Sequence, residues 1–222
     1  MATAEPARLP KITTDSTVDR VVRVLREQIV KGNLRPGTPL RVASLAEQLG
    51  TSQGPVREAI RMLVAEGLVM HEHNRGTFVR TFTEDDCLDV YVAREAIETW
   101  AVRVILDRHT TMNFSALEAA LEKMAEPDQA IESDMRFHRE LVEMAGSDRL
   151  TSAHASLIAE TALLVHSRKP FPNASYHPIH EELFDALVAG SADAPSLIAH
   201  HLRAASQLVE GRELLEYSVP RT

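Results

Sequence analysis

Four side chains in the C-terminal half of the chain could together bind a metal ion. Asp134 and His138 are four residues apart, a spacing that places both side chains on one face of a helix. His180 and His201 fall in later segments that also have helical periodicity. One carboxylate and three imidazoles from three helices could hold a divalent ion inside a bundle. Such oxygen and imidazole donors suit zinc, nickel, manganese or cobalt.

Two other interpretations of these histidines stay open. A buried histidine is usually a hydrogen-bonded core residue, and eight of the ten histidines follow residue 81. A metal-dependent hydrolase would also use histidines, but it needs a general base and an oxyanion stabiliser near the ion. The sequence has no His-Glu-x-x-His motif, no glycine-rich phosphate loop and no recognisable nucleophile motif. We therefore expect a protein that is not an enzyme.

The segment that carries these four residues predicts an all-α domain over residues 84–217. No convincing strand pattern follows residue 83, and breaks at Pro127, Gly146, residues 170–172 and Gly190 divide the periodic stretches. About six helices are expected, over residues 84–107, 115–125, 127–145, 149–168, 175–189 and 194–217. Residues 81–83 would be a linker to the preceding domain, and residues 218–222 a tail.

The preceding residues, 15–80, have the pattern of a winged helix-turn-helix. Apolar residues repeat at helical spacing from residue 15 to a stop at Lys31-Gly32, and two further helices are expected over residues 43–49 and 53–66. Thr51-Ser52 supplies an N-cap for the last of these helices. Two short β-prone runs flank a turn at residues 73–76. Residues 1–14 are polar and aperiodic, which predicts a flexible tail.

Charge is distributed unevenly between these two parts. Residues 1–80 contain 12 Lys or Arg and 8 Asp or Glu, a net charge of +4, whereas residues 81–222 contain 12 and 24, a net charge of −12. Only the N-terminal part therefore has the sign that a phosphate backbone attracts. The asymmetry is modest and does not establish DNA binding by itself.

Composition points to a cytoplasmic protein. The chain has 222 residues, 44% of them hydrophobic, and a single cysteine, Cys87, so an internal disulfide is excluded. No run is long and apolar enough for a membrane span, and residues 1–10 lack the apolar stretch of a signal peptide. We expect no association with a membrane.

Several separated motifs in residues 34–79 resemble the GntR family of bacterial regulators. They are LRPG at 34–37, LAEQLG at 45–50, SQGPVREAI at 52–60, EGLV at 66–69 and RGTFV at 75–79. The resemblance implies that the helix beginning after Ser52 enters the major groove of an operator and that the wing reaches the backbone or minor groove. The implied DNA-binding residues are Ser44, Ser52, Gln53, Gly54, Arg57, Arg61, Arg75, Gly76 and Thr77.

Arg57 is the side chain most suited to contact DNA. It follows the helix start by one turn, where it can reach a base edge or a phosphate, while Val56, Ile60 and Leu63 would fix the helix to its own core. The alternative is a surface ion pair of Arg57 with Glu58 or Glu66. Many members of the family carry arginine where this chain has Gln53, and glutamine favours adenine over guanine.

The C-terminal part resembles the ligand-binding FCD domain of the FadR subfamily. The motifs are VAREAIE at 92–98, DMRFH at 134–138, HEELFDALVAG at 180–190 and HL at 201–202. The resemblance implies a divalent metal, commonly zinc or nickel, bound by Asp134, His138, His180 and His201. His200 is the alternative to His201. A small carboxylic-acid effector would sit over the metal, with Arg94, His177, His166 and Arg168 as candidate contacts.

Side chains near these motifs also have simpler interpretations. Arg94 could clamp the carboxylate of an effector or only pair with Glu98 one turn away. Trp100 and Phe137 are expected in the core. The prediction is a homodimeric transcription factor, a repressor by resemblance, that binds a short inverted repeat of double-stranded DNA. A regulator that binds its effector without metal is the alternative.

Overall fold

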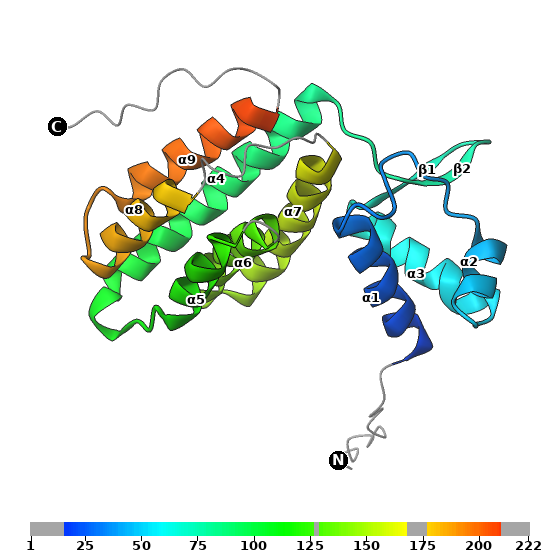
Figure 1. Cartoon of the computed structure of the whole chain (residues 1–222), viewed down its shortest axis with the longest axis horizontal. Coiled ribbons are helices and arrows are strands. Elements are labelled where there is room, and N and C mark those ends of the chain that lie inside the picture. The colour runs from blue at the N-terminus through cyan, green and yellow to red at the C-terminus, as the bar shows by residue number, and fades with distance from the viewer. Residues whose placement is uncertain (1–15, 127–128, 168–176, 210–222) are drawn as a thin grey trace, which may run out of the picture.

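The computed structural model describes residues 16–126, 129–167 and 177–209 and is mainly helical (Figure 1). A small N-terminal region with a two-stranded wing is followed by a bundle of helices, which confirms the predicted fold class. The predicted tails, residues 1–14 and 218–222, lie outside the described residues. None of the described helices is long and apolar enough to cross a membrane.

The N-terminal region consists of α1 (Thr17–Val30), α2 (Val42–Gln48), α3 (Gln53–Ala65) and the antiparallel strands β1 (Val69–Glu72) and β2 (Gly76–Val79). Helix α1 begins at a capping box, because the Ser16 hydroxyl accepts from the backbone N–H of Asp19 and the Asp19 carboxylate accepts from that of Ser16. Buried side chains of all three helices meet in one core, including Ile29, Ala46 and Leu63. Because one face of α3 packs into that core, the opposite face of α3 is held toward solvent.

The C-terminal region is built from α4 (Glu84–Asp107), α5 (Ser115–Met124), α6 (Ala130–Met144), α7 (Asp148–Ser167), α8 (His177–Val188) and α9 (Ala194–Val209), with a short 3-10 turn at His109–Thr111. Thr83 and Asp86 form a second capping box at the start of α4. The long helix α4 packs mainly against α9 and also contacts α6 and α7 (Figure 1). These helices enclose a group of buried polar and charged side chains.

The structure differs from two local expectations. Ser52 is the N-cap residue of α3, but its side chain makes no capping hydrogen bond, so the predicted cap exists in backbone conformation only. Trp100 was expected in the core and is exposed, because it lies on the face of α4 turned away from the bundle. Phe137 is fully buried, as predicted. The predicted continuation of α9 to residue 217 lies outside the described residues.

Helix α7 joins the two regions. Leu163 of α7 is part of the N-terminal core, and Glu160 forms an ion pair with Arg80, the residue after β2. The His166 ring lies against Gly32, where the chain leaves α1. In Figure 1, α7 accordingly stands at the edge of the bundle beside α1. A displacement of α7 would therefore be felt in the N-terminal region.

Candidate metal centre and DNA-reading surface

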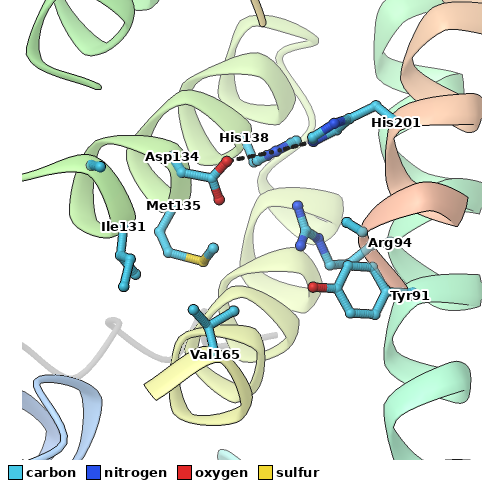
Figure 2. Close-up of a pocket in the computed structure, with 10 residues that line it drawn as sticks. Tyr91, Arg94, Ile131, Asp134, Met135, His138, Val165 and His201 are labelled. Carbon is cyan, nitrogen blue, oxygen red and sulfur yellow. Dashed lines mark hydrogen bonds and ion pairs between the residues drawn. The ribbon is translucent and has the colours of Figure 1, made fainter. Parts of the chain in front are cut away.

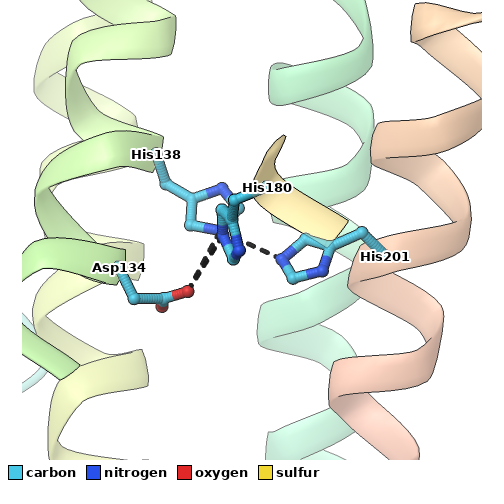
Figure 3. A group of neighbouring side chains, drawn as sticks. All are labelled: Asp134, His138, His180 and His201. Carbon is cyan, nitrogen blue, oxygen red and sulfur yellow. Dashed lines mark hydrogen bonds and ion pairs between the residues drawn. The ribbon is translucent and has the colours of Figure 1, made fainter. Parts of the chain in front are cut away.

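The four predicted metal ligands lie together inside the bundle. Helix α6 contributes Asp134 and His138, α8 contributes His180, and α9 contributes His201 (Figure 3). One donor atom from each residue lies within 4.8 Å of all the others. The three histidines are buried and Asp134 is half-buried. Residues separated by up to 67 positions thus form one compact group, to which His200 does not belong.

The contacts among these atoms suit a shared ion. The Nε2 atoms of His180 and His201 each lie 3.2 Å from the Nε2 atom of His138. Asp134 Oδ1 lies 3.0 Å from His180 Nε2, yet it is buried without a hydrogen bond of acceptable geometry. Donors at about 2.0–2.1 Å from one ion would stand about 3.0–3.4 Å apart. The residues present therefore fit a divalent metal.

Glu98 of α4 lies directly behind the cluster. Its Oε2 accepts from His138 Nδ1 at 2.6 Å, and its Oε1 accepts from Arg94 Nε at 2.8 Å and from His154 Nε2 at 2.9 Å. A carboxylate only accepts hydrogen bonds, so His138 carries its proton on Nδ1. The lone pair of His138 Nε2 is thereby directed at the other donors, which is the tautomer that a metal ligand needs.

The pKa values of the cluster residues are shifted toward the protonation states that metal ligands need. Burial lowers the pKa of His138 and holds that of His201 well below its ordinary value, so both rings are neutral. Burial alone would raise the pKa of Asp134, but the close contact with His180 and the other neighbouring imidazoles lower it. Burial likewise opposes ionisation of Glu98, and the positive charge of Arg94 reverses that effect and brings its pKa well below the ordinary range. The cluster thus offers ionised carboxylate and neutral imidazole.

A cavity of about 30 Å³ opens beside the cluster (Figure 2). Arg94 lies at its wall, with Nε bound to Glu98 and Nη1 3.5 Å from the Thr161 hydroxyl. Its third nitrogen, Nη2, is buried and has no hydrogen-bond partner. The cavity is lined by Tyr91, Arg94, Ala130, Ile131, Asp134, Met135, His138, Val165, His201 and Ala205.

The other three predicted effector contacts fare differently from Arg94. His166 does not line the cavity; its Nδ1 lies 2.8 Å from the Ala162 carbonyl oxygen and its ring faces Gly32. One residue along a helix turns the side chain by about 100°, so Val165 faces the cavity while His166 faces the N-terminal region. Arg168 lies outside the described residues. His177 begins α8, but its side chain is also outside them.

Several residues of the site were not predicted. Glu98 was considered only as an ion-pair partner of Arg94 one turn away, and His154 was not singled out at all. The face of α7 repeats His154, Ile158, Thr161 and Val165 at helical spacing, which could have marked His154 as buried. The sequence held no comparable signal for Tyr91 or Met135, because their positions depend on how separate helices pack.

The predicted DNA-binding residues lie on exposed parts of α2, α3 and the wing. Ser52, Gln53, Gly54, Arg57 and Arg61 are all exposed. Arg57 Nη1 donates to Gln53 Oε1 at 3.0 Å. The alternative pairing of Arg57 with Glu58 or Glu66 is not what the structure has, because those carboxylates bind Arg61 and Arg26 respectively.

The remaining predicted contacts frame α3 on either side. Ser44 of α2 accepts from Gln48 Nε2 at 3.0 Å and is exposed. On the wing, Arg75 is exposed, pairs with Glu72 and lies over the Phe78 ring. Gly76 and Thr77 are half-buried in β2. Side chains that can donate to phosphate or to base edges are therefore presented on three neighbouring elements.

Two protein-family models match the chain. Residues 17–79 match the model described as bacterial regulatory proteins, gntR family, and residues 89–204 match the FCD domain. The predicted DNA-binding residues on α2, α3 and the wing, here called the DNA-reading surface, fall within the first match. The histidine cluster falls within the second. The chain is also 31% identical to a protein of Paenarthrobacter nicotinovorans named "Probable D-xylose utilization operon transcriptional repressor", over 87% of this chain and 89% of that protein.

Further relatives have similar names. The HTH-type transcriptional repressor GlaR of Escherichia coli is 29% identical, with 81% of this chain and 90% of that protein covered. The crystal structure of a GntR transcriptional regulator from Rhodococcus sp. RHA1 superposes with a TM-score of 0.79 at 29% identity, over 87% of this chain and 97% of that one. E. coli McbR/YncC shares the fold, with a TM-score of 0.76 at 22% identity over 89% and 99% of the two chains.

Proposed function

The chain belongs to the GntR family of bacterial transcriptional regulators and carries an FCD domain, and from that premise we propose that it is a repressor controlled by a small carboxylate bound over a divalent metal. The DNA-binding domain would span residues 15–80 and the effector domain residues 84–217, joined by residues 81–83. Relatives named as repressors support the sign of regulation. Because its partner would be chromosomal DNA, we place the protein in the cytoplasm.

One observation carries the proposal: four metal-binding side chains converge beside an arginine nitrogen that lacks a partner. The ion would be held by Asp134, His138, His180 and His201, with zinc our first expectation and nickel, manganese or cobalt also suited to these donors. When bound, it would supply a positive centre that attracts an oxygen ligand. Its role here would be recognition, because none of the described residues that line the cavity is a serine or a cysteine.

The effector would neutralise what the cavity leaves unsatisfied. A carboxylate beside Arg94 would accept from Nη2, and a buried unpartnered guanidinium nitrogen is otherwise costly. The cavity of about 30 Å³ has room for two or so water-sized groups, which supports a compact acid. Met135, Ile131 and Val165 give the remaining wall an apolar character.

The signal would pass from this cavity to the DNA-reading surface through α7. Val165 lines the cavity, while Leu163 and Glu160 on the same helix contact the N-terminal region. In a homodimer, a shift of α7 would change how the two reading helices meet a short inverted repeat. The effector controls DNA binding only if it prefers one arrangement over the other.

Metal content tests the proposed centre. Protein purified without added metal should carry close to one ion per chain by elemental analysis, and His138→Ala and His180→Ala should abolish it. His200→Ala is the matched control, since His200 is exposed and lies beside His201 outside the donor group. Metal that survives both substitutions, or that is lost only with His200, would refute the assignment.

Thermal unfolding tests the effector class. Metal-loaded protein should be stabilised most by acetate, less by lactate and least by citrate or galactonate, because the acids exceed the described cavity increasingly in that order. Acetamide and lactamide are matched controls of similar shape without charge. Equal stabilisation by acid and amide would contradict carboxylate recognition, and undiminished stabilisation after chelation would favour the regulator that works without metal.

A further inference from the structure

The outer face of α4 carries an apolar ridge that no described residue covers. Val92 is 57% exposed and Trp100, the only tryptophan of the chain, is 43% exposed. Ala96 lies between them and is also exposed, so the three side chains follow one another at intervals of four residues. The opposite face of the same helix is buried in the bundle. A large exposed tryptophan in such a row is unusual for a surface that faces only solvent.

Charged residues border this ridge in a symmetric way. Asp89 and Arg103 are exposed, and each lies seven residues from Ala96, one on either side. Seven residues are close to two helical turns, so both side chains lie near the same face as Ala96. Neither has an ion-pair partner among the described residues. One helix cannot pair them, because they are about 21 Å apart along its axis.

We propose that this ridge binds the same ridge of a second copy, with the two α4 helices antiparallel and the two-fold axis at Ala96. This inference rests on the homodimer of the proposed function and gives that dimer an interface. An isologous contact must be complementary to itself, and residues equally spaced about the axis then face each other. Val92 packs against Trp100 of the partner subunit, and Asp89 pairs with the partner's Arg103.

The chemistry at each position agrees with this pairing. The small side chain of Ala96 allows close approach at the axis, and two Val92–Trp100 contacts flank it symmetrically. Two Asp89–Arg103 pairs then close the ends of the contact. The next acidic positions on this face, Asp85 and Asp107, lie a further turn out, where crossing helices diverge.

The interface would also be close to the effector site. Helix α4 carries Arg94 and Glu98 on its buried face, between Val92 and Trp100 in sequence. A change in how Arg94 is held therefore acts on the same two turns of helix that form the dimer contact. This arrangement gives the effector a short route to the relative orientation of the two subunits, in addition to α7.

A carboxylate placed on the ridge tests the interface in the full-length protein. Val92→Glu should raise the dimer dissociation constant by at least about a hundredfold in sedimentation velocity, because two charges would be buried without partners. Val188→Glu is the matched control, since Val188 is a comparably exposed valine on α8. Circular dichroism checks that both variants keep their helix content. Trp100 emission should shift to longer wavelength on dissociation of the Val92→Glu variant and not in the control.

Charge reversal provides a second test with an internal rescue. Asp89→Arg and Arg103→Asp should each weaken the dimer by about tenfold, because like charges then meet across the axis. The double variant should recover most of that loss, since opposite charges face each other again. Rescue within one chain is excluded by the separation of about 21 Å. Failure of the double variant to recover would overturn the antiparallel arrangement.

The outcomes separate this inference from the proposed function. If the wild-type protein is a dimer with the emission of an exposed Trp100, and the Val92→Glu variant is still a dimer, the α4 interface is overturned. The proposal of a dimeric regulator is then left intact. A wild-type protein that stays monomeric at micromolar concentration, both free and on DNA, overturns both. Loss of DNA binding by Val92→Glu together with loss of the dimer supports both.

Discussion

Two arginine–glutamate pairs, one in each region, differ in almost everything except their chemistry. Arg61 and Glu58 on α3 have side chains that are 74% and 52% exposed, whereas those of Arg94 and Glu98 on α4 are 2% and 0% exposed. Their N–O separations are nearly equal, at 2.9 Å and 2.8 Å. Arg61 can exchange Glu58 for a DNA phosphate at little cost. Loss of either Arg94 or Glu98, in contrast, leaves the other charge buried and unpaired.

This difference extends to the regions that contain the pairs. The DNA-reading surface keeps its polar groups in solvent, so its residues are available for binding and contribute little to the fold. The candidate metal centre keeps its polar groups inside the bundle, where metal binding would depend on the same contacts as stability. Substitutions should therefore affect only DNA binding in the first region, and both ligand binding and stability in the second.

The largest expected effect is that of Glu98→Gln. The substitution keeps the shape of the side chain but removes the charge that balances Arg94 and accepts from His138 and His154. Breaking a buried pair in this way costs about 3–5 kcal/mol. Denaturant unfolding of metal-free protein measures the loss. A change below about 1 kcal/mol would mean that the network does not stabilise the bundle.

The second largest expected effect is the destabilisation of the helical bundle at acidic pH. The pKa values of buried His138 and His201 lie below the ordinary 6.5, so unfolding of the metal-free protein takes up protons. Their contribution is complete above about pH 6.5 and is lost as the pH falls. Glu98 and Asp134, with pKa values below the ordinary 4.5 and 3.8, lose their contribution at lower pH still.

Thermal unfolding of chelator-treated protein between pH 8 and pH 5 checks this sign. The midpoint should fall with pH, and His201→Gln should reduce the slope because it removes one buried group that must be neutral. His71→Gln, at an exposed position of β1, is the matched control. A midpoint that rises on acidification would contradict the assignment of neutral imidazoles.

Arg57→Ala should affect DNA binding alone. Among the described residues its guanidinium is hydrogen-bonded to Gln53 alone, on the exposed face of α3, so removal should leave the unfolding midpoint unchanged. If Arg57 contacts a base, the free energy of binding to an operator selected from random DNA should weaken by about 1–3 kcal/mol. If it contacts a phosphate, the slope of the logarithm of the binding constant against the logarithm of the salt concentration should decrease in magnitude by about 1. Fluorescence anisotropy at several salt concentrations distinguishes the two contacts. Equal binding by the variant would show that Arg57 does not contact DNA.

The same contrast explains which parts could be predicted from the sequence. Helix periods and stops lie within short stretches of chain, so the winged region, α4 and the pairing of Asp134 with His138 on one face could be predicted. His180 and His201 could be named among the eight histidines after residue 81 because the motifs around them resemble the FCD domain. These predictions used local spacing or family motifs, and neither depends on how helices pack.

What could not be predicted depends on packing between distant elements. Glu98 contacts His138 and His154 from 40 and 56 residues away, and nothing in the local sequence specifies such contacts. Trp100 was expected in the core, whereas α4 turns that face outward, and which face of a long helix is covered depends on the packing of the other helices. The sequence therefore indicated which residues could bind a metal but not which residue positions them.

The smallest expected effect belongs to Glu58→Gln, the exposed counterpart of Glu98→Gln. Its pair with Arg61 is solvated on both sides, so the free energy of unfolding should change by less than about 0.5–1 kcal/mol. Affinity for DNA should rise slightly, because one negative charge leaves a surface that faces phosphates. Measuring both Gln variants by denaturant unfolding and anisotropy tests the comparison directly. If Glu58→Gln destabilised the protein as much as Glu98→Gln, burial would not be what separates the two regions.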